Sequence, residues 1–189
     1  MEPLFVNKVA NSGLLTLNLE DFLHPAPRVV YDIKDNLFHG LMLREKDFRE
    51  FLKTHDWPQY TGQNVAIVCS ADAIVPTWAY MLLAIKLQPH AHRYVFGSLE
   101  ALEQALFQEA IAGLDLETYR DAKVVIKGCG DQPVPTFAYV AIMQKLLPVA
   151  ASLMYGEPCS TVPLYKRPKT AETVAAPVAA PSLPGEATL

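Results

Sequence analysis

Apolar positions fall into two patterns along the chain, and the two patterns predict different elements. Residues 65–68 and 124–126 are uninterrupted apolar runs, which are typical of parallel strands covered on both faces. A polar loop and a Pro-Thr step follow each run and lead into residues 78–85 and 137–143, whose nearly continuous apolar character predicts largely enclosed helices. A second short apolar run then ends in glycine. The pattern therefore predicts two βαβ units.

The two βαβ units are copies of one sequence. Residues 64–97 align with residues 123–156 without a gap, and thirteen of the 34 aligned positions are identical. Ordinary composition would give about two or three identities by chance. A helix that joins two parallel strands makes a right-handed crossover. We therefore expect a single α/β domain with an internally duplicated βαβ unit, in which helices pack on a mixed sheet.

Weaker patterns predict the elements outside the copies. The expected strands are a hairpin of Phe5–Val9 with Leu14–Leu19, and two further strands at Arg28–Ile33 and Leu37–Leu43. The expected helices are Glu45–His55 and, with Ser98 as its N-cap, Leu99–Ala112.

Composition limits the number of domains and the kinds of partner. The chain of 189 residues is 51% hydrophobic, which suffices for one core. Residues 170–189 are dominated by Ala, Pro, Val and Thr and lack an aromatic residue. We therefore expect one domain over residues 1–169, followed by a disordered tail. A net charge of −4 argues against nucleic acid as a partner. The oligomeric state stays open, with a homo-oligomer as one alternative.

The distribution of apolar residues also predicts the localisation. The first residues lack a basic region followed by an apolar stretch, and no run of about 18 apolar residues occurs. We therefore expect a cytoplasmic protein that does not contact a membrane. Its three cysteines cannot all pair, so we expect thiols rather than a disulfide framework.

The three cysteines follow predicted strands. Cys69 and Cys129 come after the first strand of each copy, and Cys159 comes after the last strand of the second copy. If all these strands are parallel, the thiols leave the sheet at one edge, where neighbouring strands are only about 5 Å apart. Converging thiolates suit zinc, copper(I) or an iron–sulfur cluster, and a single activated thiol suits transfer or redox chemistry. The alternative is that the cysteines serve packing alone.

Polar residues near the predicted helix starts form a second candidate site. Asp72 and Asp131 match across the copies and precede the Pro-Thr steps, so either Asp or Thr is expected to cap the first helical turn. The alternative is a pair of sites in which the helix N-termini, Thr77, Thr136 and Ser160 hold a small anion.

No complete catalytic motif is present. The chain lacks a GxGxxG or P-loop pattern, and no Ser/His/Asp arrangement can be assembled, so enzymatic activity stays undecided. We expect the histidines to be exposed and without a structural role: His24, His39, His55, His90 and His92.

Several segments resemble a known family. They are NKVANSGLLTLNLEDF, DIKDNLF, LREKDFREFLKTHDWPQY, CSADAIVPTWAYMLLA, VVIKGCGDQPVPTFAY and MYGEPCSTVPLYKR, and together they look like the bacterial family catalogued as domain of unknown function 2480. The similarity covers roughly residues 5–168. The resemblance implies no particular reaction. It does imply a genomic association with SUF-type iron–sulfur cluster assembly, which favours a role for Cys129 and Cys159 and makes iron–sulfur assembly proteins candidate partners.

These observations lead to one expected function and two alternatives. The expected function is an accessory protein in iron–sulfur, thiol or metal metabolism that acts through Cys129 and Cys159, with Cys69 as a third ligand and an iron–sulfur cluster or zinc as the cofactor. One alternative is an enzyme or sensor that binds a small anionic ligand at the helix N-termini near Asp72 and Asp131. The other is a protein-binding scaffold that uses exposed apolar surface.

Overall fold

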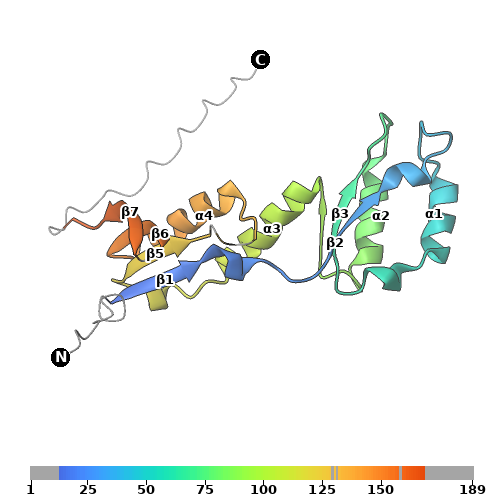
Figure 1. Cartoon of the computed structure of the whole chain (residues 1–189). Helices are drawn as coiled ribbons and strands as arrows, with labels where there is room; N and C mark the ends of the chain where they lie inside the picture. Colours follow the sequence, from blue (N-terminus) through green and yellow to red (C-terminus); the bar gives the residue numbers. More distant parts are fainter. Residues whose placement is uncertain (1–12, 129, 131, 158, 169–189) are drawn as a thin grey trace, which may run out of the picture.

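The strands of the protein form two separate sheets (Figure 1). The computed structural model describes residues 13–128, 130, 132–157 and 159–168. The first sheet is parallel, has the order β2-β3-β4, and consists of β2 (Arg28–Asp32), β3 (Asn64–Val68) and β4 (Arg93–Phe96). The second sheet has the order β1-β5-β6-β7 and consists of β1 (Leu14–Asn18), β5 (Lys123–Lys127), β6 (Ser152–Glu157) and the antiparallel β7 (Ser160–Lys166). The predicted α/β class with a mixed sheet is confirmed, although the strands divide between two sheets.

Each sheet forms a lobe together with the helices that pack on it. The α-helices are α1 (Glu45–Thr54), α2 (Thr77–Leu87), α3 (Leu99–Ala112) and α4 (Thr136–Leu146). Short 3-10 helices lie at η1 (Leu19–Phe22), η2 (Ile33–Asn36), η3 (Trp57–Tyr60) and η4 (Glu117–Tyr119). We call the first sheet with α1 and α2 the first lobe, and the second sheet with α4 the second lobe. Helix α3 lies between the lobes (Figure 1).

Each repeated segment is a strand–helix–strand unit of parallel strands. The units are β3-α2-β4 and β5-α4-β6, and their helices begin one residue after Pro76 and Pro135, as predicted. These prolines are the N-cap residues and have no side-chain acceptor. The expected cap by Asp72 or Thr77 is therefore wrong for α2, while Asp131 lies outside the described residues. In both helices the Pro carbonyl accepts a hydrogen bond of 2.9 Å from the N–H three residues later.

The amino-terminal strands enter different lobes. Strand β1 pairs with β5 and β2 pairs with β3, so the chain crosses from the second lobe to the first through residues 23–27. The expected hairpin partner of β1, Phe5–Val9, lies outside the described residues. The expected strand Leu37–Leu43 is instead a tight turn closed by a bridge from Phe38 to Met42, because His39 and Gly40 adopt φ angles of 52° and 69°.

Each lobe has its own core, and α3 contributes to both lobes. The largest side chains of the first core include Phe48 and Leu83, and the second core includes Ile142. Helix α3 covers the outer face of the first sheet with Leu102 and packs Phe107 into the second core. The two lobes are therefore joined through one helix that is apolar on two faces.

Candidate functional site

The carboxyl edge of the second sheet gathers several residues with chemical potential. Strands β5 and β6 are parallel neighbours that end at Lys127 and Glu157. The Lys127 Nζ lies 2.8 Å from Oε2 of Glu157, and this hydrogen-bonded ion pair raises the pKa of Lys127. The pair joins the ends of the two strands, so the segments that continue from them start side by side.

An apolar pocket of about 350 Å³ opens at this edge, between α4 and β7. Its lining residues are Ile126, Thr136, Tyr139, Met143, Tyr155 and Leu164. The volume lies in the range of small-molecule sites, which extends from about 300 to 1,000 Å³. The lining combines two aromatic rings with aliphatic side chains, and Thr136 adds a hydroxyl at the first turn of α4. Such a pocket fits a small ligand that is mostly apolar.

Two close contacts fix the position of Tyr139. Its hydroxyl donates a 2.7 Å hydrogen bond to the carbonyl of Gly128, and its ring meets Tyr155 edge to face at 5.8 Å. A Cβ at residue 128 would lie only 2.5 Å from the Tyr139 hydroxyl oxygen, so a side chain here would displace this hydroxyl. The first copy has Cys69 at the corresponding position.

The first lobe has the same ring pair, but no strand among the described residues covers it. Tyr80 and Phe96 occupy the positions of Tyr139 and Tyr155 and also meet edge to face, at 4.9 Å. The first sheet ends at β4, and Phe96 is 69% exposed. Strand β7 therefore supplies, through Leu164, the wall that turns the ring pair of the second lobe into a pocket.

Asp32, at the carboxyl edge of the first sheet, binds two backbone N–H groups. One of its carboxylate oxygens accepts hydrogen bonds of 3.1 Å from the N–H groups of Ser70 and Lys34. Burial raises the pKa of Asp32, but hydrogen bonds from Ser70 and Lys34 outweigh burial and hold the pKa at about 2. The Asp32 carboxylate thereby fastens the loop after β3 to the end of β2.

The structure separates the predicted thiols. Cys159 is exposed in the turn between β6 and β7, whereas Cys69 is half-buried at the end of β3, where its Sγ donates to the carbonyl of Ala71 at 3.4 Å. The expectation that all three cysteines leave one sheet edge is therefore wrong for Cys69. Cys129 lies outside the described residues, so its approach to Cys159 stays a prediction. Among the residues that the structure describes, no three His, Cys, Asp or Glu side chains are placed to hold a metal ion.

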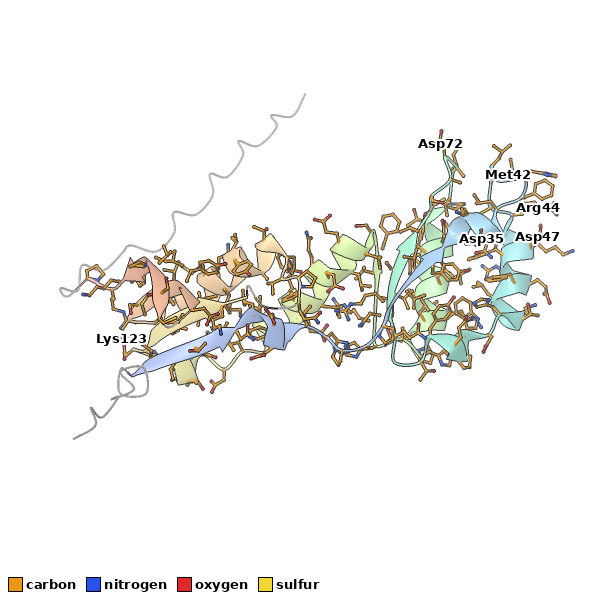
Figure 2. The ribbon with its side chains drawn as sticks, viewed as in Figure 1. Asp35, Met42, Arg44, Asp47, Asp72 and Lys123 are labelled. Carbon is orange, nitrogen blue, oxygen red and sulfur yellow. The ribbon has the colours of Figure 1, made fainter. Side chains whose placement is uncertain are left out.

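The predicted anion-binding residues also divide between the lobes. Asp72 is exposed on the loop after β3, at the opposite end of the molecule from Lys123, where β5 begins (Figure 2). Thr77 is exposed at the start of α2. Thr136 lines the apolar pocket, and Ser160 begins β7. Asp131 lies outside the described residues. The two repeated loops that the structure describes therefore do not form one shared site, and of the described candidate residues Thr136, Cys159 and Ser160 belong to the second lobe.

A larger cleft lies between the lobes, at residues that the sequence did not predict as a site. Its volume is about 690 Å³, and its charged or titratable lining residues are Glu20, His24, Arg28, Glu100 and Glu103. These residues lie outside the repeat, and no motif marks them. The histidine prediction was also wrong for His24, whose ring stacks on His92, and for His55, which packs against aromatic rings of the first core. The pocket residues Tyr139 and Tyr155 could have been found from the sequence, because both copies of the repeat have an aromatic residue at these two positions.

Comparisons with known proteins identify a family but no characterised relative. No helix among the described residues has the length and apolar character needed to cross a membrane. No curated protein and no solved structure matches the chain. One family model, described as protein of unknown function (DUF2480), matches residues 4–167. Because the match covers most of the 189 residues, this protein belongs to the DUF2480 family.

Proposed function

We propose that the protein is an accessory protein of thiol or iron–sulfur metabolism that acts at the carboxyl edge of the second sheet, with Cys159 as its working thiol. The observation that carries this proposal is an exposed thiol on the sheet edge where a pocket also opens. Ligands of parallel sheets generally bind beyond the carboxyl ends of the strands. The first lobe offers a poorer candidate, because Cys69 is half-buried and already donates to a carbonyl.

The number of thiols at this edge limits how a metal ion or cluster could be bound. With Cys69 on another sheet, at most Cys129 and Cys159 share this edge. Iron–sulfur clusters and structural zinc sites generally take four ligands. A cluster or zinc ion bound here would therefore need ligands from a second copy of the chain or from an iron–sulfur assembly protein. Thiol exchange needs only one thiol: the Cys159 thiolate would attack a partner's disulfide, form a mixed disulfide and release the partner's other sulfur as a thiolate.

The apolar pocket supports a second candidate function, the binding of a small ligand. None of the described residues that line the pocket is cationic, and the neighbouring Lys127 is paired with Glu157. A small anion therefore fits less well than a neutral, mostly apolar molecule that hydrogen-bonds with the Thr136 hydroxyl. Such a molecule would lie beside the thiol edge.

Reconstitution of the full chain tests the proposed function. The protein, purified and reduced under anaerobic conditions, is incubated with ferrous iron and sulfide or with zinc, and bound metal and visible absorption are then measured. Cys69→Ser is the matched control, because it removes a thiol from the other lobe. We expect wild type and Cys69→Ser to retain metal or cluster and Cys159→Ser to lose most of it.

A parallel assay covers thiol exchange without metal. A small aromatic disulfide is offered to each variant, and the mixed disulfide is located by mass spectrometry. We expect Cys159 to react faster than Cys69, because only Cys159 is exposed. If Cys159→Ser matches wild type in both assays, the proposed function is wrong.

A further inference from the structure

A row of polar residues, of which Asn64 is fully buried, fastens α3 to the amino edge of the first sheet. Arg28, Asn64 and Arg93 are cross-strand neighbours at the starts of β2, β3 and β4. Helix α3 meets this row with two carboxylates: Glu103 lies 2.5 Å from Nε of Arg28, and Glu109 lies 3.1 Å from Nη1 of Arg93. The fully buried Asn64 lies between these two ion pairs. The row therefore lies where α3 joins the two lobes.

His24 connects this row to the segment that crosses between the lobes. It lies in residues 23–27, and its ring stacks on that of His92 with centroids 3.9 Å apart and planes inclined by 14°. The Nδ1 atom of His24 lies 3.0 Å from Nδ2 of Asn64 and 3.3 Å from the N–H of Ala26. Both neighbours are donors, so Nδ1 must accept and the ring carries its proton on Nε2. We call this hydrogen-bonded arrangement the closed joint. It requires His24 to be neutral.

The surroundings of His24 disfavour its protonated form. Burial is the main cause that lowers its pKa, and the positive charges of His92 and Arg28 lower it further, against the opposing effect of Glu109 and Glu103. A proton on Nδ1 would point at two N–H donors and break both hydrogen bonds. It would also place a charge against the stacked ring of His92.

The polar row itself is not fully satisfied. Both Oδ1 of Asn64 and Nε of Arg93 are buried and have no hydrogen-bond partner in the part of the chain that the structure describes. Buried polar atoms without partners are rare and disfavour the state that holds them. Opening of the joint would expose these two atoms to water, which disfavours the closed state relative to the opened one.

We propose that the His24–His92 pair is a pH-sensitive switch at the joint between the lobes. In the neutral state, His24 anchors residues 23–27 to the first sheet through Asn64. In the protonated state, this anchor is lost and the segment is held only by its backbone carbonyls, which accept hydrogen bonds from Asn64 and Arg28. His24 also lines the cleft of about 690 Å³ between the lobes, together with Arg28 and Glu103 of the row. Protonation therefore changes the shape of this cleft.

Hydrogen exchange of the full chain tests this switch. Amide protection, corrected for intrinsic exchange rates, is compared at about pH 7.5 and about pH 5.5, on either side of the usual histidine pKa. For wild type we expect protection of residues 23–30 to fall by about threefold or more on acidification. His24→Asn keeps an acceptor near the Nδ1 position but does not titrate, so its protection should not fall. His39→Asn, which alters an exposed turn of the first lobe, should behave as wild type.

A second variant keeps the test decisive if His24→Asn does not fold. His92→Gln removes a group that disfavours protonated His24 next to the sheet, so its fall in protection between the two pH values should be smaller than that of wild type. The proposal is wrong if wild type loses no protection, or if His24→Asn loses as much as wild type. It is equally wrong if His24→Asn is unfolded and His92→Gln follows the wild-type pH profile.

Discussion

The two lobes use the same strand–helix–strand unit, but their carboxyl edges differ. In the first lobe, Asp32 holds the loop after β3, Cys69 is half-buried, and the Tyr80–Phe96 ring pair faces solvent on an edge strand. In the second lobe, the corresponding ring pair encloses a pocket, and an exposed thiol lies in the turn after β6. Segments of similar sequence thus have only a structural role in the first lobe, whereas they form a candidate site in the second lobe.

Three local changes account for the difference between the edges. Strand β7 pairs with β6 and supplies Leu164 as an additional wall. Met143 stands where the first copy has Ala84, which gives the pocket a flexible apolar surface. Gly128 stands where the first copy has Cys69, which lets the Tyr139 hydroxyl reach the backbone. The binding surface therefore depends on residues that the two copies do not share.

Truncation of the matched core residues should have the largest effect on stability. Leu83 and Ile142 occupy corresponding positions, and both are fully buried. We expect Leu83→Ala and Ile142→Ala each to lower the free energy of unfolding by about 2–5 kcal/mol. Because α3 packs on both lobes, chemical denaturation followed by fluorescence and circular dichroism should show one transition for each variant. Two separate transitions would show that the lobes unfold independently.

Neutralising Asp32 should destabilise the first lobe in a pH-dependent way. Its pKa of about 2 lies below the ordinary value of 3.8, so its stabilising effect is present above about pH 4 and is lost as the pH falls toward about 2. We expect Asp32→Asn to lower the free energy of unfolding by about 2 kcal/mol at neutral pH. Its stability should also change less than that of wild type between pH 4 and pH 2. A control is Asn18→Ala in the second lobe, where the uncharged Asn18 caps η1 and its loss should cost about 1 kcal/mol with no pH dependence of its own.

Filling the pocket should reduce ligand binding with a smaller effect on stability. Leu164 is half-exposed and lines the pocket, so Leu164→Trp should occupy part of its volume. We expect the affinity for an apolar fluorescent dye to fall about tenfold, which corresponds to about 1.4 kcal/mol. Val162→Trp is the matched control, because Val162 is exposed on the same strand and does not line the pocket. An equal loss of binding in the two variants would show that the dye binds elsewhere.

The sequence predicted elements that local chemistry determines. Both repeated helices follow from a Pro-Thr step and a long apolar run, and α3 follows from Ser98, which caps its first turn with a 3.3 Å hydrogen bond from Ala101. The strand expected at Leu37–Leu43 was wrong, because the local backbone requirements of His39 and Gly40 override its apolar character. Local signals were thus reliable where propensity and turn chemistry agreed.

The division into two sheets and most of the candidate site depend on contacts between distant residues. Strand β1 pairs with β5 more than 100 residues later, and no local pattern encodes this choice. The wall formed by Leu164 and the stacking of His24 on His92 likewise join segments that are separate in the sequence. Sequence patterns therefore identified the repeated strand–helix–strand unit, but they did not predict which surface each copy would present.

Removal of residues 170–189 should have the smallest effect. Their composition predicts a solvated segment, so truncation after Lys169 should change the free energy of unfolding by less than about 1 kcal/mol. Thermal denaturation of the full and truncated chains measures this difference. A clearly larger loss would mean that the tail packs on one of the lobes.

Mapping of disulfides after mild oxidation tests most directly whether the carboxyl edge of the second sheet is the thiol site. A disulfide requires Cα atoms about 4.4–6.8 Å apart, so it forms only between cysteines that can approach closely. Monomer isolated from a non-reducing gel should contain a Cys129–Cys159 disulfide with Cys69 still free, because β5 and β6 are neighbours whereas β3 lies in the other sheet. Monomer in which Cys69 pairs with either cysteine, or in which Cys129 and Cys159 both stay unpaired, would contradict the account.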